Sequence, residues 1–479
     1  MGYIQGKNRD QVTLLPEKID DYVTEDNIVR FIDTFVDGLN MKDLGFKHAT
    51  VSHKGRYPFD PKDMLKLYIY SYLIKIRSSR RIEEETHRNI ELMWLVRKLT
   101  PDHKTICNFR SDNDVVLKEV FKEFVFVCKS LDLLGKKLIA VDGSKFKAVN
   151  SKDNCFTAKK IKDNLDKIDE DINKYFKELE TKDKEDEQKE EMKDKKLKEK
   201  INHLQKAKKE YEEIQKKLTE SGDTQISLTD PDSKLMKTRH GRDICYNVQV
   251  AADDKHNLIV NFEVTNDCND TNQLNNAAEP AKKILGVKKI DAVLDTGYFC
   301  NEEIKKALDN GITPYIPEPT KNNSSKEDKK FGKNEFTYDQ EKDVYVCPNG
   351  CELTHRENKK DKKTGEEYKI YRTSKCKNCP IVEKCTTDKK RGRKVQRWKN
   401  EKLIDDMKER CKKEKEKVGK RKGIIENIFG TIKRGFGQGY FLTKGLKKVT
   451  GEFSLTALAY NIKRVVNIIG VKDMIKALS

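Results

Sequence analysis

The sequence has no long apolar run. No segment approaches the roughly 18 consecutive apolar residues of a membrane-spanning helix, and the mean hydropathy is −0.85. The opening residues, MGYIQGKNRD, hold no apolar signal core and lack the Ser or Thr at the sixth position that N-myristoylation requires. These absences argue against a membrane partner and predict a cytoplasmic protein.

Negative charge is outnumbered in this chain. There are 80 Asp and Glu residues against 99 Lys and Arg residues, which gives a net charge of +19 and a sequence pI of about 9.1. A basic excess of this size favours a polyanionic partner, with nucleic acid ahead of an anionic membrane. On length alone, 479 residues suggest roughly three domains, at least one with a sizeable core.

Cysteine is not scarce, but the twelve cysteines do not suggest a disulfide framework, because a cytoplasmic chain keeps its thiols reduced. The spacing Cys376-x2-Cys379, with Cys385 six residues further on and Cys347 upstream, is typical of four thiolates around a structural zinc ion. Cys351 is a fifth candidate that can replace Cys347. A disulfide pair or thiols without a metal are the alternatives.

Residues 1–135 carry helical patterns throughout. Apolar residues recur at intervals of three and four residues between Ile28 and Leu39. Asp60-Pro61 is typical of a helix start, with Asp60 as the cap and Pro61 in the first turn. Short helices joined by polar turns are compatible with a helix-turn-helix DNA reader. Its candidate DNA contacts are Arg80, Arg81, Lys104 and Arg110. The alternative is a helical bundle in which these cations are merely solvated.

The middle of the chain alternates between strand and helix patterns. An apolar, β-branched run at residues 137–147 predicts a strand that carries Asp142. Two amphipathic segments then flank the charged stretch KDKEDEQKEEMKDKK, which predicts an antiparallel helical hairpin inserted between strands. Its interpretation as an arm for dimerisation or DNA-backbone contact competes with that of a solvated spacer.

Residues 244–317 continue the core. Their patterns predict a hairpin of two strands, a helix at 277–285, a strand at 290–295, a helix at 301–310 and a last strand. With the strand of Asp142, the order is three strands, helix, strand, helix, strand, which is that of a ribonuclease H-like sheet. The expected fold class is therefore α+β/α/β, a mixed-sheet core with an N-terminal all-helical domain, a helical-hairpin insertion and a small zinc-ribbon-like insertion.

These patterns predict five segments. They are an N-terminal helical DNA-binding domain at 1–135, a catalytic core at 136–150 and 227–317, a charged hairpin insertion at 151–226, a cysteine-rich zinc-binding insertion at 318–400, and a C-terminal part of the core with a Glu-bearing helix at 401–479.

The C-terminal segment contains the helical pattern GIIENIFGTIK, residues 423–433. Its isoleucines and Phe429 recur on one face, which Glu426 interrupts, so a cationic or metal partner for this carboxylate is implied. Lys433 follows on the same side as Glu426. Asp142 and Asp295 each end an apolar run upstream. Three carboxylates in this order suit a two-metal phosphoryl-transfer site, because Mg²⁺ takes oxygen ligands and leaves positions for phosphate.

Several motifs together carry a family resemblance over nearly the whole length. They are YPFDPKDMLKLYIYSYLIKIRSSRRIE, PDHKTICNFR, VDGSKF, DPDSKLM, YNVQVAADDKHNLIV, DTGYF, the cysteine cluster, ENIFGTIKRGFG and TALAYNIKR. In combination the chain resembles bacterial insertion-sequence transposases of the DDE type. Relatives often carry an Arg four residues before the Glu of their Glu-x6-Lys helix; here that place is Lys422, with Arg421 beside it.

The resemblance implies an enzyme that cuts the ends of its element and joins them to a target. Asp142, Asp295 and Glu426 would hold two Mg²⁺ ions, for which Mn²⁺ can substitute, and Arg421 and Lys433 would hold phosphates. Either Trp398 or Tyr440 could stack on a displaced base, although packing is the stronger interpretation of the tryptophan. Double-stranded DNA is the expected partner, bound by a homodimer on synapsed ends at the nucleoid.

Two other functions remain open at this stage. The chain can be a transposase-derived DNA-binding protein without catalysis, or a metal-dependent nuclease without joining. Taken singly, each acid also has an ordinary explanation, since Asp142 and Asp295 suit turns and Glu426 suits a surface ion pair. The competing acids Asp267, Asp291 and Glu302 do not end a buried strand beside a glycine turn.

Overall fold

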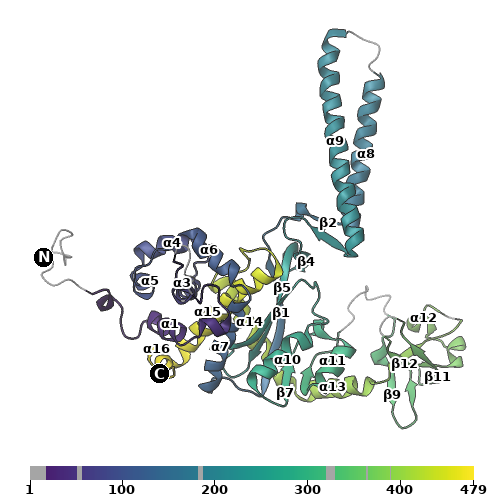
Figure 1. Ribbon diagram of the computed structural model, residues 1–479. Helices are drawn as coiled ribbons and strands as arrows, with labels where there is room; N and C mark the ends of the chain where they lie inside the picture. Colours follow the sequence, from purple (N-terminus) through teal and green to yellow (C-terminus); the bar gives the residue numbers. More distant parts are fainter. Residues whose placement is uncertain are drawn as a thin grey trace, which may run out of the picture. The chain divides into compact units, whose positions relative to one another are not determined.

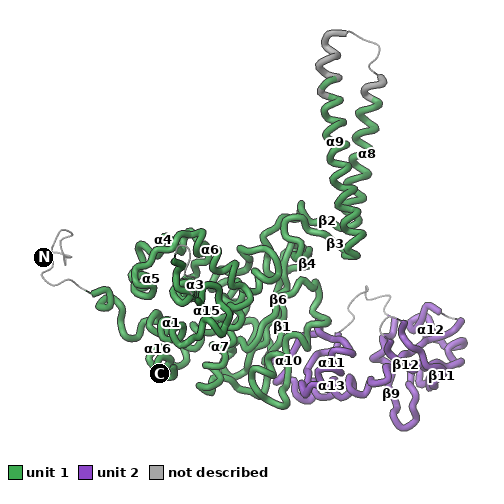
Figure 2. The backbone as a smooth tube through the Cα atoms, viewed as in Figure 1, with its two compact units in different colours: residues 1–292, 420–479 green, residues 293–419 purple. Residues whose placement is uncertain are grey.

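The structure is a computed structural model that describes residues 18–50, 57–181, 187–319, 330–362, 365–388 and 390–478. The chain divides into two compact units, residues 1–292 with 420–479 and residues 293–419 (Figure 2). The N-terminal helices and most of the predicted core therefore belong to one unit, and the five predicted segments remain a finer division of the chain.

Unit 1 opens with short helices, as the patterns predict. After the single turn η1 (Ile19–Tyr22), they are α1 (Ile28–Asp37), α2 (Met41–Leu44), α3 (Pro61–Leu73), α4 (Ser79–Arg88), α5 (Ile90–Leu95), α6 (His103–Asp112) and α7 (Val116–Ser130). Asp60 caps α3 with Pro61 in the first turn, and Asp102 caps α6.

A mixed sheet forms the centre of unit 1 (Figure 1). Its strands are β1 (Leu138–Lys147), β4 (Lys234–Thr238), β5 (Gly241–Asp253), β6 (Ile259–Thr265) and β7 (Ile290–Val293). The order is β4-β5-β1-β7, and β6 also pairs with β5. β1 and β6 both run antiparallel to β5. Asp142 lies opposite Val250 and Ser144 opposite Val248, so these four side chains share one face of the sheet.

Helices from both ends of the chain pack on this sheet. α10 (Leu274–Leu285), α7 and α15 (Leu446–Ile469) all contact β6. α15 is buried along most of its length, including Leu455, Leu458, Ile462 and Val465. Asn461 of α15 pairs with both backbone groups of Ile259, at 2.9 and 2.8 Å, and so satisfies the start of β6. α14 (Lys415–Gly430), the π-helical turn η6 (Thr431–Gly435) and α16 (Val471–Lys476) complete this part.

The predicted helical hairpin is confirmed. α8 (Ala158–Thr181) and α9 (Glu187–Ser221) lie side by side (Figure 1), and beneath them η2 (Lys152–Asn154) precedes the short strands β2 (Cys155–Thr157) and β3 (Gln225–Ser227), which pair antiparallel. Ile161, Ile214 and Leu218 are buried together with Phe156 at the base. Of the charged apex KDKEDEQKEEMKDKK predicted at residues 182–196, residues 182–186 lie outside the described residues, and the rest belongs to α9.

Unit 2 begins with the last residue of β7. It continues through η3 (Thr296–Tyr298), α11 (Asn301–Asp309) and β8 (Ile312–Tyr315). Along the chain, β1, β5, β6, α10, β7, α11 and β8 follow the predicted order of three strands, helix, strand, helix, strand. The structure adds one strand that the patterns did not predict, β4, which precedes β5 and pairs with it.

A second sheet occupies the predicted cysteine-rich insertion. After η4 (Lys333–Glu335), its strands are β9 (Thr337–Asp339), β10 (Val344–Val346), β11 (Glu352–Lys360), β12 (Glu367–Arg372) and β13 (Val395–Trp398). Neighbouring strands run antiparallel in the order β13-β12-β11-β10-β9. The turns η5 (Ser374–Asn378) and α12 (Val382–Cys385) carry three cysteines, and α13 (Glu401–Lys413) follows. Among the helices of the described ranges, none has the length and apolar character that crossing a bilayer needs.

Candidate active site and cysteine cavity

Asp142 lies in the middle of β1, where the strand changes from buried to half-buried residues. The four preceding residues are buried β-formers, and they anchor the strand in the core. The Gly143 N–H donates to the Asp142 carboxylate at 2.8 Å. A Cβ at Gly143 would meet the Gln249 side chain at 2.3 Å, so only glycine fits beside this carboxylate.

Arg421 forms an ion pair with Asp142, and both side chains are largely buried. The resemblance implied that Arg421 binds phosphate. In this structure its guanidinium is instead paired with Asp142, the candidate catalytic carboxylate. The pairing follows from α14, which places the Arg421 guanidinium against the half-buried Asp142 carboxylate.

Lys433 contacts the same strand two residues further on. Its ammonium donates to the Ser144 hydroxyl at 2.7 Å and to the Lys145 carbonyl at 2.6 Å, and it lies 4.5 Å from the centre of the Phe146 ring. Burial, assisted by the positive charges of Arg239 and Lys145, lowers the pKa of Lys433 to about 8. The ammonium therefore loses its proton more readily than that of a lysine in water.

Glu426 lies on α14 between these two contacts. Ile424, Ile425 and Ile428 are buried, but Glu426 is exposed, and Phe429 is only half-buried. The prediction that Glu426 interrupts a buried face and therefore needs a partner is wrong. The buried face of the helix is narrower than its apolar composition suggests, and the carboxylate is turned toward solvent.

Asp295 belongs to unit 2. β7 ends at Val293, and two residues later Asp295 caps η3, where its carboxylate accepts from the Gly297 N–H at 2.8 Å. The side chain is half-buried. This is the turn-forming geometry that Asp-Thr-Gly favours, and it leaves further carboxylate lone pairs for another ligand.

The predicted DNA contacts divide into exposed and buried side chains. Arg80 and Arg81, in the first turn of α4, and Lys104 in α6 are exposed. Arg110 is buried and donates to the Tyr72 hydroxyl at 3.3 Å. The prediction that Arg110 reaches DNA from the surface is therefore wrong for this structure. Its charge faces inward because α6 packs against α3, where the tyrosine accepts its hydrogen bond.

The two candidate stacking rings also differ. Trp398 is buried at the end of β13, which agrees with the preference for packing over base contact. Tyr440 is exposed, and the Arg77 guanidinium lies 4.5 Å from the centre of its ring.

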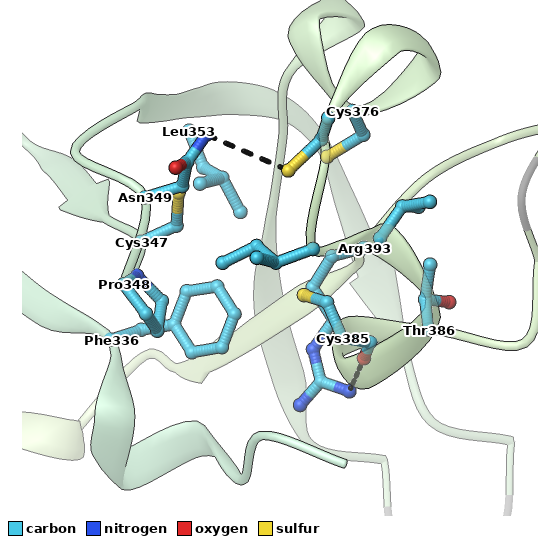
Figure 3. A pocket seen from close by; sticks show the side chains of 12 residues that line it. Phe336, Cys347, Pro348, Asn349, Leu353, Cys376, Cys385, Thr386 and Arg393 are labelled. Carbon is cyan, nitrogen blue, oxygen red and sulfur yellow. Dashed lines mark hydrogen bonds between the residues drawn. The ribbon is translucent and has the colours of Figure 1, made fainter.

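Four thiols line one small cavity in unit 2 (Figure 3). Cys347, Cys376, Cys379 and Cys385 line it, with apolar neighbours that include Phe336 and Leu353. The cavity measures about 20 Å³, which is enough for one water-sized occupant. All twelve cysteines are free thiols. Burial raises the pKa of the Cys385 thiol, and the three neighbouring cysteines add to this effect.

The local backbone explains how these thiols meet. Gly392 has a φ of +73°, and a Cβ there would lie 2.5 Å from the Cβ of Cys376, so glycine permits this close approach. The Cys351 N–H donates to the Cys347 sulfur at 3.3 Å, while Cys351 itself does not line the cavity. Across the described ranges, no three His, Cys, Asp or Glu side chains are gathered closely enough to hold a metal ion.

Sequence reasoning missed a group of buried charges around the segment 439–446. They are Arg77, Asp230 and Glu452, which are buried, and the half-buried Asp232. Glu452 was detectable as a single acid in the otherwise apolar helix pattern GEFSLTALAYN. The motif DPDSKLM contained the two aspartates, but nothing in its spacing indicated their partners more than 200 residues away.

Two family comparisons match separate parts of the chain. The transposase DDE domain family matches residues 346–466, and the transposase domain family DUF772 matches residues 17–112. The first match contains Glu426 and Lys433, and the second contains the N-terminal helices. These two matches support the expected resemblance of the chain to DDE-type insertion-sequence transposases.

The other comparisons add little. Comparison with curated proteins gives no significant match. Among solved structures, the chain is similar to a piggyBac transposase in a synaptic complex with hairpin DNA, with 8% identity and a TM-score of 0.32, covering 94% of this chain and 76% of that one. A likeness of this degree carries no argument about mechanism.

Proposed function

We propose that this transposase binds the terminal inverted repeats of its insertion sequence and catalyses strand cleavage and strand transfer with two Mg²⁺ ions. The observation that supports the proposal most is the attachment of the Glu426 segment to β1. Arg421, before Glu426, pairs with Asp142, and Lys433, after it, contacts Ser144 and the Lys145 carbonyl. The segment that matches the DDE domain family therefore contacts β1, the strand that carries Asp142, through residues on either side of Glu426.

The chemistry of the donors suits a hard divalent ion. The Asp142 carboxylate already pairs with a cation, the Arg421 guanidinium, and the Glu426 side chain is exposed to solvent. Together with Asp295, these carboxylates would hold the two Mg²⁺ ions, with Mn²⁺ as a substitute. When bound, the ions supply activation of the attacking oxygen and stabilisation of the leaving oxygen, so no protein nucleophile is needed.

The cations of the site have a different task. For Asp142 to accept a metal ligand, the Arg421 guanidinium must leave it, and a DNA phosphate is its natural next partner because guanidinium binds phosphate bidentately. Lys433, whose pKa is lowered to about 8, gains a counter-charge when a phosphate approaches. Both side chains would therefore hold the scissile strand while the acids orient the reacting oxygens.

The remaining parts support DNA handling. Arg80, Arg81 and Lys104 present exposed charge on the N-terminal helices, where they would contact the terminal repeats. Cys347, Cys376, Cys379 and Cys385 would hold a structural Zn²⁺, because four thiolates leave no open coordination position. Two ends must be brought together, so a homodimer is the expected assembly, acting at the nucleoid in the cytoplasm.

Strand cleavage and joining on a labelled duplex that carries the element's own end tests this function. Wild type, Glu426→Gln and Glu416→Gln are compared with Mg²⁺. Glu416 is an exposed glutamate on the same helix and serves as the matched control. We expect wild type and Glu416→Gln to cut and join, and Glu426→Gln to bind the end without either reaction.

Two other outcomes contradict the proposal in different ways. Cleavage by wild type without joining would indicate a nuclease. Binding without cleavage under any divalent metal would indicate a transposase-derived DNA-binding protein.

A further inference from the structure

Arg77 lies in the turn between α3 and α4, and its guanidinium contacts the core. The side chain is 7% exposed, whereas Arg80 and Arg81, a few residues further on, are exposed to solvent. The counter-ion of Arg77 is the fully buried Glu452 of α15, and 3.2 Å separate the guanidinium nitrogen from the carboxylate oxygen. This short stretch of chain therefore has one cation that contacts the core and two that face solvent.

The same guanidinium nitrogen also reaches the segment 439–446. It donates to the Tyr440 carbonyl at 2.7 Å. The segment is in turn paired with the end of β1, where the Phe441 N–H donates to the Lys147 carbonyl at 2.9 Å. β1 also carries Asp142, five residues before Lys147. One guanidinium thus connects the start of α4 to the strand of the first candidate catalytic acid.

Glu452 holds the next two residues of the segment. Its carboxylate accepts from the N–H groups of Leu442 and Thr443 at 3.0 Å and from the Thr443 hydroxyl at 2.8 Å. A buried ion pair often gives no more stability than apolar side chains of similar volume, because both charges lose their hydration. Its hydrogen bonds are nevertheless directional and hold the two partners in one geometry. The Arg77–Glu452 pair is therefore better explained by the position it fixes than by stability.

Close backbone packing holds α15 against the N-terminal helices. Gly451, beside Glu452, faces the residues before α7, and a Cβ on it would lie 2.7 Å from the Asp114 carbonyl oxygen. Backbone cannot move aside as the end of a flexible side chain can, so only glycine fits here. α15 also contacts α3 and α6. These helices therefore form one packed body, which Arg77 connects to the segment paired with β1.

Two sets of DNA contacts depend on this connection. In the proposed function, Arg80 and Arg81 contact the terminal repeat, while Asp142 helps to hold the ions at the scissile phosphate. Phosphate contacts fix the register of a protein on a duplex, although they carry no sequence information themselves. Successive phosphates of one strand are about 3.4 Å apart along the helix axis. A small shift between the two sets of contacts would therefore move the cut to a neighbouring phosphate.

We propose that Arg77 determines which phosphate is cut, by holding the DNA contacts of α4 at a fixed distance from the strand that carries Asp142. The inference rests on the proposed function, and it makes Arg77 a positioning residue that acts through the backbone of the segment 439–446. The segment meets β1 at Lys147, roughly 17 Å along the strand from Asp142. Loosening this connection should change the position of the cut while the acids keep their chemistry.

The test maps the cut at nucleotide resolution on a labelled duplex that carries the element's own end, with the full chain and Mg²⁺. Arg77→Lys keeps a counter-charge for Glu452 but replaces the planar guanidinium with a flexible ammonium. Glu452→Gln keeps an acceptor oxygen without the charge. We expect wild type to cut at one main phosphate and both variants to spread their cuts over adjacent ones. The ratio of main to neighbouring cuts should fall about 10-fold, the value of one charge-assisted hydrogen bond.

Lys118→Gln is the matched control. The Lys118–Glu263 ion pair, at 2.6 Å, also joins an N-terminal helix to the core sheet, because Lys118 lies in α7 and Glu263 in β6. Lys118 contacts Glu263 and the Phe262 ring, so its loss should weaken the packing and leave the position of the cut unchanged. Anisotropy measures how tightly each variant binds the end, and thermal unfolding reports whether each variant is folded.

The outcomes distinguish this inference from the proposed function. If both variants fold and bind the end but cut only at the wild-type phosphate, at whatever rate, the positioning role is wrong and the transposase function stands. If Lys118→Gln spreads its cuts as widely as they do, the register does not depend on Arg77, and the inference is again overturned.

A double variant covers the case in which a single variant does not fold. Arg77→Met with Glu452→Met removes both charges together, which proteins tolerate better than the loss of one partner. Cuts spread over adjacent phosphates support the positioning role, and a single cut at the wild-type phosphate overturns it. If wild type does not cut the end, both proposals are overturned.

Discussion

The side chains around Asp142 and the thiols of the cysteine cavity are brought together over very different lengths of chain. Asp142 and Arg421 are 279 residues apart, and Lys433 and Ser144 are 289 residues apart. The four cysteines all lie between residues 347 and 385, on neighbouring turns of one small sheet. The first group contains the ion pair of Asp142 with Arg421 and a lysine that donates to uncharged oxygens, and the second consists of thiols that line an apolar cavity.

This difference shows how each group depends on the rest of the protein. The thiols meet through short-range turns, so a metal is the natural element that would stabilise their small sheet. The charged group meets only because α14 packs on β1, so its geometry is supplied by the core of unit 1. Changes in the cysteines should therefore alter folding, whereas changes around Asp142 should alter ligand binding and pH dependence.

Loss of one thiolate should have the largest effect. In Cys376→Ser, we expect the protein to lose about one equivalent of zinc and the cooperative unfolding of the sheet that contains β9–β13, because structural zinc contributes roughly 10 kcal/mol or more to folding in small domains. Metal analysis and calorimetry measure the two effects. Cys107→Ser, at an exposed thiol of α6, should change neither. If wild-type protein purified without zinc is as stable as wild-type protein that contains zinc, the expected difference between the cysteines and the charged group is wrong.

Release of Asp142 should have an intermediate effect. Arg421→Gln breaks a largely buried, charge-assisted pair, so we expect the free energy of unfolding to fall by about 1.5–3 kcal/mol. Without DNA, Mn²⁺ should bind more tightly to this variant than to wild type, because the guanidinium no longer competes for the carboxylate. Denaturant unfolding and electron paramagnetic resonance measure these changes.

Lys420→Gln is the matched control for that experiment, since Lys420 is the neighbouring residue and its pair with Asp254 spans 3.7 Å at an exposed site. We expect a change within about 0.5 kcal/mol. Equal losses of unfolding free energy in the two variants would show that the Arg421–Asp142 pair stabilises the fold no more than the Lys420–Asp254 pair does.

The pH dependence from Lys433 should be the smallest effect. Its pKa is lowered from 10.5 to about 8 in the folded protein. Between these values the unfolded chain binds more protons, so this residue makes the free energy of unfolding rise with pH, by at most about 1.4 kcal/mol per unit. Urea unfolding between pH 8 and 10 should therefore give a shallower rise in Lys433→Met than in wild type. If the free energy of unfolding changes with pH equally in wild type and Lys433→Met, the Lys433 ammonium is solvated in the folded state.

Local pattern predicted much of the fold. Apolar runs with β-branched residues predicted β1, the hairpin of β5 and β6, and β7, and Asp-Pro and Pro-Asp pairs predicted the starts of α3 and α6. These signals depend on residues that are close together in the sequence, so they can be recognised without the tertiary structure. The family resemblance supplied the remaining assignments, and the transposase matches agree with it.

The errors concern the environment of single side chains. Arg110 carries the same charge as Arg80, but it faces Tyr72 in the core while Arg80 faces water. Glu426 was expected beside a buried face and is exposed. Helical periodicity gives the relative angle of two residues, but the width of the buried face depends on what packs there, which periodicity does not contain.

By itself, the sequence determined most of the element order, the position of Asp142 and Asp295 after apolar runs and the spacing of the cysteines, because each depends on a few consecutive residues. Only the tertiary structure decided that Arg421 neutralises Asp142, that Lys433 has a lowered pKa, and that Glu452 holds the segment bearing Tyr440. Ion pairs, burial and long-range hydrogen bonds arise when distant segments exclude water together, and that exclusion exists only in the folded chain.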